Sequence, residues 1–258
     1  MLSLLFLATL ALATLAVTLA ASASRDRDQA TARGLRQAWL DRSATAVRAW
    51  YGQHLAETGR RSEALDMRAV LAQANVQPLH AVGAASSVRL FEDGVGGHRM
   101  VLWLPGASGA EARIDPLTGI VSVPADCLIA RISGIDIQRQ ASEATGRLIA
   151  VMARSIERWA VARRRLELDD IGCNPFRAEP PCQAPGRTLP RLDDYTDAGE
   201  INWVELGIGE VPTRDAWGGK IEVSTRVGAR HQAPPFSIAI RSLPPYGGEI
   251  IVQAIQPL

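Results

Sequence analysis

The feature that most constrains this chain is its opening segment, in which the first 24 residues carry no charged side chain. Leu, Ala and Val dominate it, and Arg25 is the first charge. At about 1.5 Å per residue a helix over this segment is roughly 35 Å long, enough to cross a hydrocarbon core of about 30 Å. Buried helices of cytosolic proteins rarely lack a polar face over so many turns. Residues 1–24 therefore predict a membrane anchor helix, with leucines at Leu4, Leu7, Leu12, Leu15 and Leu19.

A cleaved signal peptide is the competing interpretation of the same segment. Ala21-Ser22-Ala23 fits the small-x-small pattern of a cleavage site. The missing basic stretch before the apolar run, and the length of that run, favour a retained anchor. Both interpretations place the rest of the chain across the inner membrane of a bacterium, so we keep both open.

The composition indicates a folded protein without a general affinity for nucleic acid. Hydrophobic residues make up 47% of the 258 residues and charged residues 21%, which suits a packed core. Lys and Arg number 28 against 27 Asp and Glu, a net charge of +1. Because this balance gives no overall attraction to phosphate, we expect no nucleic-acid partner.

The anchor is expected to continue as a soluble helix. Residues 24–57 contain no proline, and an apolar stripe recurs at spacings close to three and four residues. We expect one unbroken helix that ends near Gly59, because glycine readily takes the cap conformation. The stripe consists of Leu35, Trp39, Val47, Trp50 and Leu55.

The remaining pattern predicts short strands around a second long helix. A short helix is expected over 63–74, and the long one begins near Ser142 and carries an apolar stripe from Leu148 to Trp159. Strand-like runs separated by glycine or proline turns are 87–91, 99–104, 112–114, 120–123, 203–206, 220–227, 236–242 and 249–255. We expect the last three to form an antiparallel meander. The fold class is thus α+β: a long N-terminal helix, a second helix and an antiparallel β-sheet.

A short internal echo favours two similar modules. The segment from Asp115 to Val123 faintly echoes the segment from Asp215 to Val223, and each is a turn that leads into a strand. The expected organisation is an anchor over 1–24, a helix plus a first β-module over 25–135, and a second helix, a Pro- and Cys-rich loop and a C-terminal β-module over 136–258.

Two of the three cysteines are placed to form a disulfide in an oxidising compartment. Cys173 and Cys182 bracket a proline-rich segment, and their spacing suits a loop-closing disulfide that stabilises by roughly 2–3 kcal/mol. Zinc is a poor alternative, because no second Cys or His pair lies nearby. Cys127 lies in an apolar run and is expected to be a buried free thiol.

No motif predicts catalysis, so we expect a protein that is not an enzyme and that holds no cofactor. The four histidines have no metal-ligand spacing, and we expect His54, His98 and His231 at the surface or in caps. No nucleophile elbow, phosphate loop or dinucleotide fingerprint occurs. Calcium bound through Asp193, Asp194 and Asp197 is the alternative to a solvated acidic loop.

Two stretches resemble pilin-like proteins. Trp203-Val-Glu-Leu-Gly207 followed by Asp215-Ala-Trp-Gly-Gly219 is similar to pseudopilins, in which an LG segment precedes a D-x-W-G turn that opens the terminal hairpin. The run from Ser24 to Leu55 looks like the lower half of a pilin helix. The motif residues of the turn are Asp215, Trp217 and Gly218.

The resemblance implies a pilin-like fold and a structural or assembly role in a type IV pilus or a type II secretion system. It implies a single-pass inner-membrane protein with its bulk in the periplasm, or a place in an extracellular filament. Its partners would be other pilin-like subunits or assembly proteins, and some pseudopilins hold calcium in this part of the fold.

One feature of the family is missing. Nothing matches the Gly-aromatic-x-x-x-Glu prepilin peptidase site, because Met1 already lies in the apolar run. The true start then lies upstream, or the chain is an accessory component that is not processed like a pilin. A cleaved periplasmic or secreted binding module, and an envelope enzyme of unrecognised type, are the alternative functions.

Overall fold

The computed structural model describes residues 2–76, 84–106, 109–167, 173–176, 194–226 and 234–256, with the side chains of 2–16 and 164–167 left aside. The chain divides into two compact units, which interleave along the sequence. The first comprises residues 1–50, 65–87 and 100–132, and the second comprises 51–64, 88–99 and 133–258. The expected α+β class, with an N-terminal helix and antiparallel sheets, is confirmed. The division at 135/136 stays a prediction.

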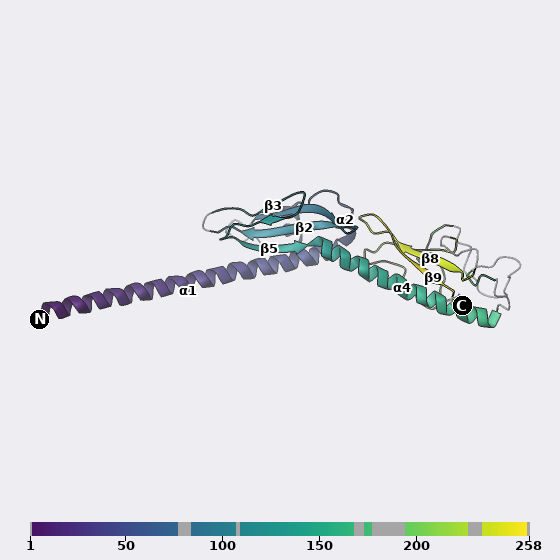
Figure 1. Cartoon of the computed structure of the whole chain (residues 1–258), viewed down its shortest axis with the longest axis horizontal. Coiled ribbons are helices and arrows are strands. Elements are labelled where there is room, and N and C mark those ends of the chain that lie inside the picture. Colours follow the sequence, from purple (N-terminus) through teal and green to yellow (C-terminus); the bar gives the residue numbers. More distant parts are fainter. Residues whose placement is uncertain are drawn as a thin grey trace. The chain divides into compact units, whose positions relative to one another are not determined.

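Figure 1 labels several of the helices and strands. The helices are α1 (Leu2–Gln53), α2 (Leu55–Arg60), α3 (Met67–Gln73), α4 (Gly134–Glu167) and the short 3-10 helix η1 (Ala198–Glu200). The strands are β1 (Ala84–Glu92), β2 (Val95–Leu104), β3 (Arg113–Ile114), β4 (Val121–Ser122), β5 (Leu128–Ser133), β6 (Thr196–Asp197), β7 (Ile221–Ser224), β8 (Ser237–Ser242) and β9 (Ile250–Ile255).

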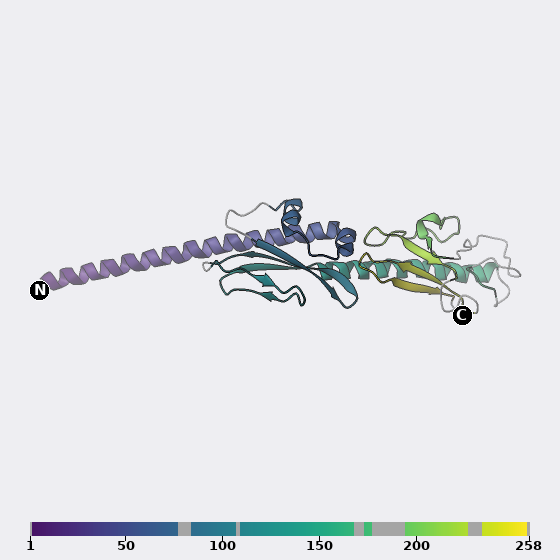
Figure 2. The ribbon, with the colours of Figure 1, turned by 90° about the horizontal axis from the view of Figure 1, so that it is seen from above.

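Helix α1 is a single unbroken helix of 52 residues, as the missing prolines predicted (Figure 2). Its side chains are exposed throughout 17–35, whereas Leu40, Ala44 and Val47 form a buried face at helical spacing. Arg48 donates a hydrogen bond to the Arg131 carbonyl of β5, 3.2 Å away. The lower part of α1 is therefore packed into the first unit.

The expected end of the first helix at Gly59 is wrong. The helix stops at Gln53, because His54 has a non-helical backbone, and a new short helix, α2, then contains Gly59. A Cβ on Gly59 would lie 2.5 Å from Cγ of Pro245. Glycine is therefore needed here for the close approach of a loop rather than for a cap.

The first unit has a small core beside short strands. Val101 and Trp103 of β2 pack with Ala112, and β3 pairs antiparallel with β4 through Arg113↔Ser122 and Ile114↔Val121. Strand β2 lies between β1 and β5 in a three-stranded sheet. The sequence does not predict strand β5, because the apolar run after Cys127 indicates only the burial of that cysteine.

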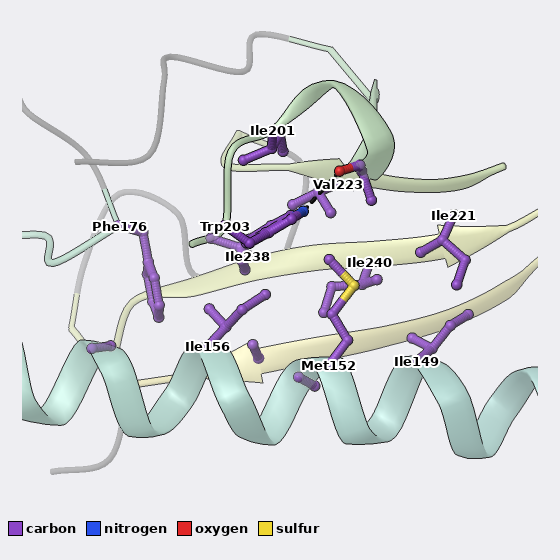
Figure 3. Close-up of a cluster of buried hydrophobic side chains, with 14 of the residues drawn as sticks. Ile149, Met152, Ile156, Phe176, Ile201, Trp203, Ile221, Val223, Ile238 and Ile240 are labelled. Carbon is purple, nitrogen blue, oxygen red and sulfur yellow. Dashed lines mark hydrogen bonds between the residues drawn. The ribbon is translucent and has the colours of Figure 1, made fainter. Parts of the chain in front are cut away.

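The second unit packs α4 against the four-stranded sheet β6-β7-β8-β9. Figure 3 shows Ile149, Met152 and Ile156 of α4 pointing toward the strands. The antiparallel pairing of β7 with β8 and of β8 with β9 confirms the expected meander. The expected strand over 203–206 is wrong: this segment is a turn, fixed by the Trp203 indole N–H, which donates to the Ala198 carbonyl at 2.7 Å.

Helix α4 begins at Gly134, so the expected start near Ser142 is wrong. The Ser133 hydroxyl accepts a hydrogen bond from the Asp136 amide and satisfies the first turn. Gln138 and Thr145 are fully buried on the inner face of this helix. Because these two polar residues interrupt the apolar stripe, the hydrophobic pattern of the sequence does not reveal the first turns of α4.

Candidate functional site

The motif residues Asp215 to Gly219 form a tight turn directly before β7. The Asp215 amide donates to the Gly219 carbonyl and the Gly218 amide to the Asp215 carbonyl, both at 3.0 Å. The Asp215 carboxylate accepts from the amides of Trp217 (2.9 Å) and Gly219 (2.6 Å). Gly218 has a φ of 75°, a conformation that favours glycine. Each residue of the motif thus has a defined part in closing the turn.

Three side chains of the second unit fasten this turn in place. The Trp217 indole N–H donates to Oε1 of Gln138 at 2.7 Å, and the Ala216 amide donates to the Thr145 hydroxyl at 3.1 Å. The Ser242 hydroxyl donates to Oδ2 of Asp215 at 2.7 Å. The turn is thereby joined to α4 and to β8, and Trp217 is only 8% exposed.

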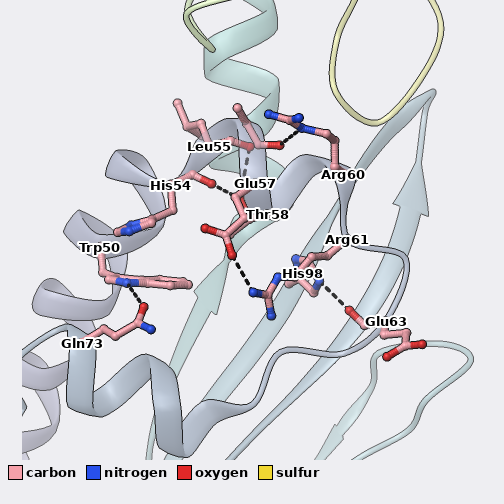
Figure 4. A network of polar contacts seen from close by, with 11 residues as sticks. Trp50, His54, Leu55, Glu57, Thr58, Arg60, Arg61, Glu63, Gln73 and His98 are labelled. Carbon is pink, nitrogen blue, oxygen red and sulfur yellow. Dashed lines mark hydrogen bonds and ion pairs between the residues drawn. The ribbon is translucent and has the colours of Figure 1, made fainter.

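Gln138 extends the same network to α2. Its amide nitrogen donates to the Leu55 carbonyl at 2.9 Å and to the Thr58 hydroxyl oxygen at 3.3 Å. The Thr58 hydroxyl donates in turn to the His54 carbonyl at 2.9 Å (Figure 4). Gln138 and Thr58 are both fully buried. One amide side chain therefore holds the motif turn and α2 together.

His98 lies in a second buried polar cluster. Its Nε2–H donates to the Glu63 carbonyl at 2.9 Å, because a carbonyl only accepts, and Nδ1 then accepts from the Tyr51 hydroxyl at 3.1 Å. Burial lowers the pKa of His98 to about 4, and the positive charges of Arg89 and Arg61 act in the same direction. The imidazole is therefore neutral near pH 7.

The expectation that His98 lies at the surface or in a cap is wrong, because the residue is fully buried. The hairpin turn uses Asp93 and Gly94, which have φ of 51° and 78°, and β2 begins at Val95. Gly97 lies within that strand, where a Cβ would come 2.7 Å from the backbone of Ile135. The glycine pair at 96–97 therefore marks close packing within the strand rather than a turn.

An open groove of about 310 Å³ borders the motif turn. The charged side chains at its rim make local contacts in and next to α2. Nε of Arg60 donates to the Ala56 carbonyl, and Glu57 forms an ion pair with Arg61. Its lining contains no serine, threonine or cysteine that could act as a nucleophile. The lining residues are Gly52, Gln53, His54, Leu55, Ala56, Glu57, Arg60, Ala216 and Trp217.

The acidic positions proposed for calcium are only partly described. Asp197 accepts from the Gly199 amide at 2.9 Å and pairs with Lys220 (3.1 Å) and Arg214 (3.4 Å). The Gly199 hydrogen bond, with these two cations, lowers the pKa of Asp197. Asp194 is exposed, and Asp193 lies outside the described residues. Over the described ranges no three His, Cys, Asp or Glu side chains converge as metal ligands. A calcium ion at Asp197 would compete with two cationic side chains.

The cysteines differ in state. Cys173 is disulfide-bonded, while its expected partner Cys182 lies outside the described residues, so the pairing stays a prediction. Cys127 is a free thiol, as expected, but it is half-buried rather than buried. Its Sγ donates to the Ala110 carbonyl at 3.1 Å.

The five leucines expected in the anchor all belong to α1. The side chains of Leu4, Leu7, Leu12 and Leu15 lie outside the described part, and that of Leu19 is 61% exposed. Within the residues that the structure does describe, no helix is both long enough and apolar enough to span a bilayer.

No family model, no curated protein and no solved structure matches this chain. Its function must therefore be argued from its own residues.

Proposed function

We propose that this protein is a pilin-like or pseudopilin-like component of a type IV pilus or type II secretion machine, anchored in the inner membrane and without catalytic activity. The observation that carries the proposal is the division of α1 into two parts. Its side chains are exposed over 17–35, while the face from Leu40 onward is buried. The uncharged segment 1–24 lies in the part of α1 before this buried face, and an apolar helix that its own fold does not cover has a physical use when lipid or other helices surround it.

The sequence of α1 suits both surroundings. Residues 1–24 carry no charge, and Arg25 to Asp28 alternate in sign at the point where the helix would leave the lipid. Alanines at 8, 11, 13, 16, 20 and 23 would let neighbouring helices approach closely. The same surface would thus contact lipid while the unassembled subunit is held in the inner membrane. It would pack against other subunits after assembly.

The motif turn supports the same role. Its buried polar groups bond to α4 and to β8, so they position structure. The turn leads directly into β7, as the D-x-W-G turn of pseudopilins leads into a terminal hairpin.

The experiment is to locate the full-length chain, with a C-terminal tag, in a Gram-negative host. We expect it to sediment with inner membranes, to resist alkaline carbonate, and to become accessible to protease once the outer membrane is opened. The double substitution Leu12→Arg and Leu15→Arg should release it from the membrane, because a charge inside the bilayer costs about 2.5–3.5 kcal/mol per residue. Leu35→Arg with Leu117→Arg, the same change at exposed positions outside the anchor, should leave it bound.

Two results would overturn the proposal. A soluble periplasmic protein whose first residue is Ser24 would favour the cleaved binding module. A chain found in the cytoplasm would contradict both interpretations.

A further inference from the structure

The exposed face of α4 carries a basic stripe. Arg147, Arg154 and Arg158 are exposed at spacings of seven and four residues, which place them on one side of the helix. Val151, 47% exposed, lies between them. In the described part of the chain no acidic side chain pairs with Arg154 or Arg158, while Arg147 lies 3.9 Å from the exposed Glu143. We call Arg147, Val151, Arg154 and Arg158 the basic stripe.

The acid nearest to this stripe along the helix is used within the unit. Oε1 of Glu157 accepts a hydrogen bond from the Ile255 amide of β9 at 3.0 Å. Its carboxylate is therefore bonded to the sheet, and Glu143, beside Arg147, is the only acid that pairs with an arginine of the stripe in the described part of the chain.

The segment 198–211 of the same unit has the opposite character. Glu200, Glu205 and Glu210 are all exposed, and the segment contains no Lys or Arg. Val204, 62% exposed, lies among them. The nearest cations along the chain, Arg214 and Lys220, both pair with Asp197. We call Glu200, Val204, Glu205 and Glu210 the acidic loop.

The two surfaces lie at opposite edges of one sheet. The strand order is β6-β7-β8-β9; α4 packs mainly against β9, whereas the acidic loop follows β6 directly. In Figure 3, Ile201 of the acidic segment lies at the top and α4 at the bottom, with the strands between them. One copy can therefore present the basic stripe to one neighbour and the acidic loop to another.

We propose that the basic stripe of one copy binds the acidic loop of a second copy. Each surface has an exposed valine among charges of a single sign, and the signs are opposite, so the two are complementary. Contact between two different surfaces is head-to-tail, and it extends into an open chain of subunits when the rotation does not close. The contact lies in the second unit and needs no anchor helix, so it stands apart from the function proposed above. A second copy is favoured over nucleic acid because this chain itself carries the matching acidic surface.

Charge reversal on the purified full-length chain in detergent tests the contact. Sedimentation velocity over a range of concentrations, at low and high salt, measures self-association. Arg154→Glu with Arg158→Glu, and separately Glu205→Arg with Glu210→Arg, should each weaken it more than about tenfold, because like charges then face each other. Arg113→Glu with Arg131→Glu, the same change at exposed positions of the first unit, should leave it unchanged.

Complementation makes the test specific. A mixture of the two reversed variants, and a chain that carries both reversals, should recover the association, since opposite charges again meet. Circular dichroism and urea midpoints equal to those of the wild type would show that the variants fold. The proposal is overturned if the wild type does not self-associate, if both reversals leave its association unchanged, or if the mixture fails to recover. Loss of binding to anionic vesicles or nucleic acid in the arginine variant, without loss of self-association, would identify another occupant and also overturn it.

Discussion

Acid should destabilise this protein through a single histidine. The pKa of His98 is about 4 in the fold and 6.5 in a model peptide, so the unfolded chain binds the proton first as the pH falls. Above pH 6.5 the residue is neutral in both states and has no effect. Between 6.5 and about 4 the free energy of unfolding decreases by about 1.4 kcal/mol per pH unit, a total of about 3 kcal/mol.

The contacts of His98 explain why the fold resists this proton. Nε2–H already donates to the Glu63 carbonyl, and Nδ1 accepts from the Tyr51 hydroxyl. A proton on Nδ1 would point at that hydroxyl and force it to become an acceptor. The charge would also be buried, with the guanidinium groups of Arg89 and Arg61 acting against it.

Urea unfolding of the full chain, followed by tryptophan fluorescence from about pH 7.5 to about pH 4.5, measures the effect. The wild type should lose about 2–3 kcal/mol more than His98→Gln over this range, because the amide does not titrate. His54→Gln, a control at a histidine outside the buried cluster, should follow the wild type. Parallel losses in the wild type and in His98→Gln would refute the reasoning.

Two further substitutions test the packing of the second unit. Gln138→Ala should destabilise by about 1–3 kcal/mol, because the buried indole N–H of the motif turn loses its acceptor, whereas the exposed Gln140→Ala should change the urea midpoint little. Gly97→Ala should lower the free energy of unfolding by about 1–3 kcal/mol, because its Cβ would meet the Ile135 backbone. Gly146→Ala, with open space around it, should raise that free energy by about 0.5–1 kcal/mol. Thermal melts with equal midpoints for the two variants would contradict this account.

Local patterns were enough to predict α1 and the last three strands. A run without proline over residues 24–57 favours a helix, which forms up to Gln53, and Pro244 to Gly248 supply the turn between β8 and β9. Predictions failed where tertiary contacts decide. The inward-facing Gln138 and Thr145 look like surface residues, because their partners lie more than 60 positions away in sequence. His98 and Gly97 were misplaced for the same reason: His98 bonds to Tyr51 and to the Glu63 carbonyl, Gly97 packs against Ile135, and all three partners are distant along the chain.

The sequence echo between the two Asp-initiated turns has a structural counterpart. Oδ1 of Asp115 accepts from the amides of Leu117 and Thr118 at 2.8 Å, much as Asp215 accepts from the amide of Trp217. The two turns differ in burial: Leu117 is 87% exposed, whereas Trp217 is buried. The two turns therefore share a local hydrogen-bond pattern, while the hypothesis of two related modules stays a prediction.

Cross-linking at Leu19 tests most directly whether α1 is a retained anchor that contacts other subunits. In a Cys127→Ser background, Leu19→Cys is oxidised in intact membranes and compared with Leu117→Cys, an exposed position of the first unit. Our account predicts disulfide-linked dimers for Leu19→Cys and monomers for Leu117→Cys. A mature chain that has lost residue 19, or a membrane-bound chain in which Leu19→Cys stays monomeric, would contradict it.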